Sequence, residues 1–151
     1  MTDPTQTLNN FLFKYGVDTT TNFDLKDIAK DLGIKVKVVM HDELKGLEDL
    51  NKSQKNLVIN LDSSENKGSH WVCLYLGLDK NKYYFDPYGV LPIAAVQNLD
   101  GLLYNTLQIQ PDGTKMCGQL CLYVLYNLEK GEEFEDLVLR MYEEMEDILN
   151  P

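Results

Sequence analysis

Cys117 is the residue of this sequence whose type and position best suit covalent chemistry. A thiol becomes a nucleophile when its thiolate is stabilised and a substrate can reach it. A run of apolar residues predicts a helix over 116–129, which places Cys117 in the first turn, after the polar loop 111–115. Unpaired backbone N–H groups and the helix dipole favour an anion there, and Gly118 leaves room for a substrate backbone. Taken alone, a cysteine on such a helix is more often a small residue of the core.

The other two cysteines, Cys73 and Cys121, are predicted to be inert core residues. Cys121 falls one turn further along the same helix on its buried side, and Cys73 lies in the middle of a predicted strand. An odd number of cysteines argues against a disulfide scaffold. The two histidines, His41 and His70, form no zinc-binding set with them at a familiar spacing. We therefore expect neither a metal nor a cofactor.

His70 and Asp86 are the candidates for a general base and for the carboxylate that orients it. They flank two segments, 71–78 and 83–85, whose predicted pairing as a hairpin brings the two residues toward each other. An imidazole base needs a partner that fixes its tautomer. A tight turn would place Asp86 opposite Tyr75, so contact with His70 requires a wider loop, a bulge or a staggered register. The alternatives are a surface histidine and an aspartate that ends a strand in an Asp-Pro turn.

Gln110 precedes Cys117 by seven residues and follows a predicted strand over 106–109. A side-chain amide in that place could join the backbone N–H of Cys117 in stabilising a tetrahedral oxyanion. Gln108 is a second candidate for this role, and a polar loop residue is the simpler interpretation of either glutamine. His41 is interpreted as a solvated loop histidine.

The elements that would position these residues are helices and short strands. The segment 71–78 is almost wholly apolar, as expected of a strand buried on both faces. Residues 34–38 alternate between apolar and polar, as a half-buried strand does, and Asn22 is the predicted cap of the second helix. The predicted helices are 6–15, 24–32, 93–104, 116–129 and 133–149, and the predicted strands are 34–38, 57–59, 71–78, 83–85 and 106–109.

The order of these elements predicts one domain over residues 1–151 with an α+β fold. We expect a mainly antiparallel sheet packed against the buried central helix 116–129. The last helix, 133–149, is amphipathic, with an acidic outer face that is interpreted as solvated surface.

The composition, with 44% hydrophobic and 25% charged residues, is typical of a globular domain. A formal net charge of -10 without a Lys/Arg-rich run repels phosphate backbones and anionic lipid surfaces, so neither nucleic acid nor a membrane is expected as a partner. No apolar run approaches the roughly 18 residues that span a bilayer. The first residues lack the pattern of a secretory signal. An intracellular location is therefore expected.

Four pieces of the sequence occur in the order found in one group of cysteine proteases. They are His70-Trp71, Phe85-Asp86-Pro87-Tyr88-Gly89, Gln110 and Cys117-Gly118-Gln119-Leu120-Cys121. Together they resemble the adenovirus maturation protease (adenain) and its relatives, which include the SUMO-specific proteases. The resemblance covers residues 57–130. Papain-type enzymes differ, because their cysteine precedes their histidine.

This resemblance implies a Cys-His-Asp triad on an adenain-like fold. Cys117 would attack the scissile carbonyl, His70 would transfer the proton and Asp86 would hold His70. Gln110 and the backbone N–H of Cys117 would form the oxyanion hole, and Trp71 would pack beside the site, where it would shield the ion pair or shape the substrate channel. Members of the group commonly cut after Gly-Gly or Gly-X-Gly, so the implied substrate is an extended protein segment with glycines at the cut.

Two differences from the group restrict the expected substrate and biological role. Adenovirus proteases are basic and are stimulated by DNA, whereas this chain is acidic. The chain is also too compact for the large exosite with which a SUMO-specific protease grips its partner. Both departures favour a small endopeptidase for capsid or core precursors of a virophage- or polinton-type virus, acting in the host cell and virion. The alternatives are a deconjugating isopeptidase for ubiquitin-like proteins, a Cys/His acyltransferase and an inactive binding module.

Overall fold

A computed structural model of the chain describes residues 7–44, 55–61, 70–77 and 81–150. Helices and strands occur in a mixed order, which confirms the α+β class. The elements are α1 (Leu8–Tyr15), α2 (Asn22–Leu32), β1 (Lys37–Met40), the 3-10 helix η2 (His41–Glu43), β2 (Lys55–Asn60), β3 (Trp71–Leu76), β4 (Lys82–Phe85), α3 (Ala94–Gln97), β5 (Leu102–Tyr104), α4 (Cys117–Glu129) and α5 (Phe134–Leu149).

The five strands form one sheet in the order β1-β2-β3-β4-β5. The central pairs β2/β3 and β3/β4 are antiparallel, whereas the outer pairs β1/β2 and β4/β5 are parallel. The prediction of a mainly antiparallel sheet is therefore wrong, and the sheet is mixed. The reason is topological, because the segments before β2 and after β4 return to the sheet by crossovers that sequence periodicity does not reveal.

Strand β3 is buried on both faces, as its apolar sequence predicts. Trp71 and Cys73 belong to the large hydrophobic core, while Val72, Leu74 and Leu76 belong to a smaller core on the opposite face of the sheet. The smaller core is closed by residues around α3, among them Val96. Leu78, predicted to end this strand, and the predicted turn residues Asp79 and Lys80 lie outside the described residues, as does residue 6 of the first predicted helix.

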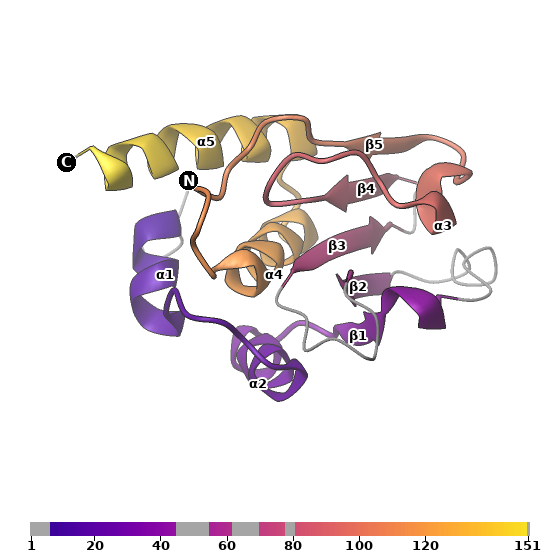
Figure 1. Cartoon of the computed structure of the whole chain (residues 1–151), viewed down its shortest axis with the longest axis horizontal. Coiled ribbons are helices and arrows are strands. Elements are labelled where there is room, and N and C mark those ends of the chain that lie inside the picture. The colour runs from indigo at the N-terminus through magenta and orange to yellow at the C-terminus, as the bar shows by residue number, and fades with distance from the viewer. Residues whose placement is uncertain (1–6, 45–54, 62–69, 78–80, 151) are drawn as a thin grey trace.

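Helix α4 is the centre of the large core. Eleven of its thirteen residues are buried, and it lies between the sheet and the helices α1, α2 and α5 (Figure 1). This arrangement confirms the predicted buried central helix. Helix α5 packs through its apolar stripe, which includes Phe134, Leu137 and Met141, and leaves its acidic side exposed. Within the part of the chain that the structure describes, no helix is both long and apolar enough to cross a bilayer.

Helix α2 begins one residue earlier than the predicted cap suggested. Thr21, not Asn22, is the N-cap, because its side chain accepts a hydrogen bond from the Asp24 N–H while the Asp24 carboxylate accepts one from the Thr21 N–H. At the other end, the N–H of Ile34 bonds to the Ala29 carbonyl. Ile34 therefore belongs to the helix cap, and the strand predicted over 34–38 is shifted to Lys37–Met40.

The predicted helix over 93–104 is limited to Ala94–Gln97. A turn with Gly101 at a φ of +75° follows, and Leu102–Tyr104 joins β4 as the edge strand β5. The predicted strand over 106–109 is also wrong. This segment is irregular, and the N–H groups of Ile109 and Gln110 instead bond to the single carbonyl of Pro87. Pairing with β4 overrides the local helical preference in the first case.

Candidate active site

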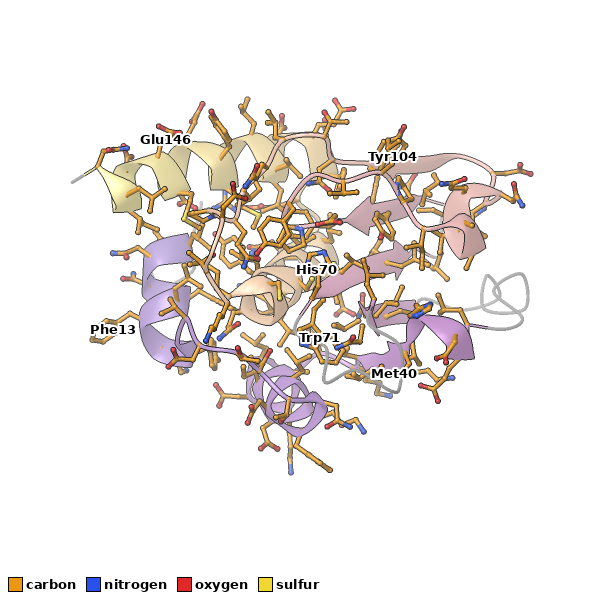
Figure 2. The ribbon with its side chains drawn as sticks, in the orientation of Figure 1. Phe13, Met40, His70, Trp71, Tyr104 and Glu146 are labelled. Atoms are coloured by element: carbon orange, nitrogen blue, oxygen red, sulfur yellow. The ribbon has the colours of Figure 1, made fainter. Side chains whose placement is uncertain are left out.

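The start of β3 lies against the start of α4, which joins the two halves of the proposed site. The backbone N–H of Trp71 donates to the Sγ of Cys117 over 3.4 Å, and the Sγ of Cys121 donates to the Trp71 carbonyl over 3.4 Å. Figure 2 shows His70 and Trp71 at this end of β3. The His70 side chain interacts with the Cys117 thiol through a side-chain hydrogen bond, so the imidazole lies beside the sulfur.

A wide hairpin loop brings Asp86 to His70. The register pairs Cys73 with Phe85, so the next residue, Asp86, follows the strand opposite Val72 instead of Tyr75. The loop is closed by a hydrogen bond from the Gly77 N–H to the Asn81 carbonyl, and it is longer than a two-residue turn. Of the three ways to reach His70 that the sequence left open, the wider loop is the one observed.

His70 and Asp86 form an ion pair in which Nε2 lies 3.2 Å from the Asp86 Oδ1. The Asp86 carboxylate is 1% exposed and the His70 side chain 22% exposed. Burial lowers the pKa of His70, but hydrogen bonds and charge from Asp86 and Cys117 outweigh burial and raise the pKa from 6.5 to about 9. The imidazole is therefore held as an imidazolium at neutral pH, next to the thiol.

Cys117 is the first residue of α4 and is 3% exposed. Met116, the N-cap residue, provides no side-chain hydrogen bond, and no acidic residue lies in the first turn. The positive end of the helix is therefore not neutralised by a carboxylate of its own first turn. With His70 on one side and the Trp71 N–H on another, the sulfur lies among groups that stabilise negative charge.

Tyr88 fixes both members of the ion pair. Its backbone N–H donates to Asp86 Oδ1 over 2.7 Å, and its ring stacks on the imidazole of His70 with centroids 5.0 Å apart. The carboxylate is thus oriented by the turn after β4, in which the Tyr88 N–H bonds to Asp86 Oδ1. The aspartate that ends a strand and the aspartate that orients a histidine are the same residue.

Gln110 lies near the site but uses its amide elsewhere in this structure. The residue is 1% exposed, and its Nε2 donates to the Tyr88 hydroxyl over 3.1 Å and to the Thr114 carbonyl over 2.9 Å. Its Oε1 is buried and has no hydrogen-bond partner. Gln108, the competing glutamine, is exposed and donates to the Gln110 carbonyl and to Asp112. Both amide hydrogens of Gln110 are therefore occupied before any substrate is present.

Trp71 and Gly118 share a contact with the segment before α2. The indole Nε1 donates to the Thr20 carbonyl over 3.2 Å, and Trp71 is 4% exposed. A side chain at Gly118 would clash with the Thr20 hydroxyl and lie 2.8 Å from Leu25 Cδ2. Packing against Thr20 and α2 thus gives a structural reason for the glycine, and the approach of a substrate at Gly118 stays a prediction.

His70 and Trp71 each line a separate cavity. A cavity of about 470 Å³ is lined by His70, Asp86, Tyr88 and Gln108, among others. A second, of about 480 Å³, is lined by Trp71, the segment Thr19–Asn22 and the strand β1. Cys117 itself is not among the residues that line either cavity.

The two remaining cysteines are core residues, as predicted. Cys73 is 1% exposed and Cys121 fully buried, and the Cys73 thiol donates to the Cys121 carbonyl. Burial, followed by contact with Cys73, raises the pKa of Cys121, so this thiol stays neutral. Among the described residues there is no group of three or more His, Cys, Asp or Glu side chains that could hold a metal ion. His41 is half-buried in η2.

Sequence reasoning missed Asn105, Thr20 and the role of Tyr88 in this site. Asn105 binds the backbone of Asp86 with both atoms of its amide. No spacing or periodicity distinguishes a buried asparagine of this kind from an ordinary loop asparagine. Tyr88 had a signal, since it lies inside the Asp-Pro-aromatic-Gly piece. No protein-family model matches the chain, and no curated protein sequence is significantly similar to it.

Proposed function

We propose that the chain is a cysteine peptidase in which Cys117 is the nucleophile, His70 the base and Asp86 the orienting carboxylate. The observation that carries the proposal is the His70 imidazole, which contacts Asp86 through Nε2 and interacts with the Cys117 thiol. With Nε2 taken by Asp86, Nδ1 is the nitrogen left to exchange a proton with the thiol. That nitrogen is buried and makes no regular hydrogen bond. Acyl transfer by a thiol requires a nucleophile in contact with a base, and a third group that orients the base.

The proposed reaction divides into two half-reactions. The Cys117 thiolate attacks the scissile carbonyl, and the tetrahedral oxyanion is stabilised by the N–H of Cys117 at the start of α4. The protonated His70 then gives its proton to the leaving amine, which leaves a thioester on Cys117. Water, deprotonated by His70, attacks the thioester; the C–S bond breaks, the substrate leaves as a carboxylic acid, and the Cys117 thiolate and protonated His70 are restored. Gln110 is the proposed second oxyanion donor, and it takes this role by turning away from Tyr88 or Thr114.

The proposed substrate class rests on the resemblance to the adenovirus maturation protease and the SUMO-specific proteases. On this basis the chain is an adenain-like endopeptidase that cuts viral capsid or core precursors after Gly-Gly or Gly-X-Gly. The two cavities support an extended substrate, because one is lined by His70 and the other by Trp71, and the Trp71 N–H contacts the thiol. The acidic character of the chain supports a protein substrate without nucleic acid as a cofactor. The virus would be of virophage or polinton type.

A second candidate function is an inactive binding module of the same fold. The burial of Cys117, at 3% exposure, favours it, because a nucleophile must be reached by its substrate. The two functions differ in one property of the isolated protein. A peptidase has a reactive thiol that depends on His70, whereas a binding module has a thiol that reacts slowly and without regard to His70.

The test is the rate of Cys117 alkylation by iodoacetamide as a function of pH, followed by intact mass and peptide mapping. Wild type is compared with His70→Ala, and His41→Ala is the matched control for the loss of an imidazole. Cys117→Ala identifies the modification of the other two thiols. We expect wild type and His41→Ala to react well below the pH of about 8.5 at which a free thiol ionises. His70→Ala should lose that reaction.

A reaction that rises only near the pH of a free thiol, and is unchanged in His70→Ala, would refute the peptidase proposal and favour the binding module. If the reactive limb is present, the substrate is sought next. A Gly-Gly-containing peptide is compared with a ubiquitin-like protein fused through its Gly-Gly tail. Cleavage of the fusion alone would indicate a deconjugase instead of an endopeptidase.

A further inference from the structure

The side chain of Asn105 binds the backbone of Asp86 at two points. The Asp86 N–H donates to Oδ1 of Asn105 over 2.9 Å, and Nδ2 of Asn105 donates to the Asp86 carbonyl over 2.7 Å. The same Nδ2 donates to the Leu107 carbonyl over 3.1 Å. Asn105 is 5% exposed, so these bonds are made away from water. The side-chain amide of Asn105 thus bonds to both the backbone N–H and the backbone carbonyl of Asp86.

The Asn105 side chain takes the place of backbone hydrogen bonds between β4 and β5, whose pairing ends before Asp86. Strands β4 and β5 pair in parallel up to Tyr84 and Tyr104, and the two chains part after that point. Asp86 follows β4 closely and is 1% exposed, so its backbone groups need partners inside the protein. Only an amide side chain offers a donor and an acceptor side by side. Asn105 directly follows β5 and provides both groups.

The Asn105 contact is one of several that join residues 86–89 to residues 105–110. The Pro87 carbonyl accepts from the N–H groups of both Ile109 and Gln110, each over 2.9 Å. A Cβ at Gly89 would lie 2.7 Å from the Thr106 carbonyl oxygen, which shows how closely the two segments approach. The first segment carries Asp86 and the second carries Gln110, so Asn105 lies at the joint between them.

We infer that Asn105 is a positioning residue of the proposed active site, which aims the Asp86 carboxylate at His70 and keeps the Gln110 segment in register with it. The inference rests on the proposed function, since it assigns Asn105 a role only in relation to that site. Asn105 acts through Asp86, and in the described structure it makes no bond to His70 or Cys117. Its loss should therefore weaken the ion pair without removing a reactive group.

Among the described residues, the groups that contact His70 are the Asp86 carboxylate, the Cys117 thiol and the Tyr88 ring, and Asp112 is a further acidic residue that lines the same cavity. Of these, only Asp86 is bonded to Asn105 by its backbone, and Tyr88 follows through its N–H on the same carboxylate. A movement of Asp86 removes part of what raises the pKa of His70 above 6.5. The titration of His70 thus reports the position of Asp86.

The experiment compares Asn105→Ala and Asn105→Ser with Asn127→Ala in the full chain. Asn127 is the matched control, because it is 2% exposed and donates one hydrogen bond to the Tyr123 carbonyl inside α4. Three properties are measured: the melting temperature, the His70 titration by NMR and iodoacetamide alkylation of Cys117. The chain has two histidines, so the His41 resonance provides an internal reference. Asn105→Ser keeps the comparison available if the alanine variant does not fold.

We expect both Asn105 variants to lower the pKa of His70 by about one pH unit, a roughly tenfold loss of proton affinity, and to slow alkylation at neutral pH by a similar factor. Asn127→Ala should lower the melting temperature and leave both other properties unchanged. Asn105 variants that lose only melting temperature, as the control does, would overturn the inference while the proposed function stands. A wild-type His70 that titrates near 6.5 would overturn the proposed function itself.

Discussion

Asp86→Asn is the substitution that separates the charge of the proposed orienting group from its shape. Asparagine has nearly the same size, so the buried position is filled and the Tyr88 N–H keeps an oxygen acceptor. The variant loses the negative charge 3.2 Å from His70 Nε2. An uncharged partner no longer favours the imidazolium over the neutral ring.

The size of the effect follows from the pKa of His70. Burial lowers this pKa, and Asp86 and Cys117 together raise it from 6.5 to about 9. The net change of 9 − 6.5, about 2.5, corresponds to ~3 kcal/mol at about 1.4 kcal/mol per pKa unit. Asp86 shares it with Cys117, so the variant should lower the pKa of His70 by at least about one pH unit. The rate of alkylation at neutral pH should fall by roughly tenfold or more.

The change of stability with pH depends on which protonation state of His70 the folded protein favours. The folded protein favours protonated His70, so this stabilisation is complete below pH 6.5 and is lost as pH rises through about 9. Denaturant unfolding of wild type and Asp86→Asn at pH 6 and pH 10 tests this. The free energy difference between the two proteins should be larger at pH 6 by ~1–3 kcal/mol.

Asp112→Asn is the control for these measurements, because Asp112 lines the same cavity as His70 and bonds to Gln108. It should leave the His70 titration and the pH dependence of unfolding as in wild type. The same His70 pKa in Asp86→Asn and wild type would refute the reasoning. A stability difference that does not vary between pH 6 and pH 10 would refute it as well.

Three further substitutions test the surroundings of the site. Gly89→Ala should lower the free energy of unfolding by ~1–3 kcal/mol, measured by urea denaturation, because φ is +72° and the added Cβ would lie 2.9 Å from the Leu107 backbone. Gly118→Ala should cost a similar amount by overpacking against Thr20, and an unchanged melting temperature would contradict the packing explanation. With a cleavable peptide in hand, Gln110→Ala should lower kcat by roughly 10²-fold with little change in KM. Equal kcat values for the variant and wild type would exclude Gln110 as an oxyanion donor.

Local sequence patterns were sufficient for the elements whose character is continuous along the chain. Strand β3 is apolar at every position because both of its faces are buried, and α4 is apolar around most of its circumference because it lies inside the core. Such segments are predicted from their continuous apolar character together with their length and flanking residues. The short elements between β4 and α4 were not. There the pairing of Leu102–Tyr104 with β4, and the bonds of Ile109 and Gln110 to Pro87, decide the backbone.

The candidate site divides in the same way. The residue types, their order and the position of Cys117 at a helix start follow from the sequence, because each depends on the identity of neighbouring residues. The meeting of His70 with Asp86 does not, because it depends on the length of a hairpin loop, and the hairpin register could equally have placed Asp86 opposite Tyr75. The packing of Gly118 against Thr20 and the hydrogen bonds of Asn105 to the Asp86 backbone could also be found only from the structure.

By itself, the sequence determined an α+β domain with a buried central helix and a set of residues competent for thiol chemistry. Hydrophobic periodicity and residue chemistry are local properties, so a single chain displays them. Only the tertiary structure decided that the sheet is mixed, that Asp86 lies 3.2 Å from His70 and that the Trp71 N–H contacts the Cys117 sulfur. These contacts join residues far apart in the sequence. Their formation depends on strand register and on the docking of α4 against β3, where the burial of many side chains at once selects one arrangement.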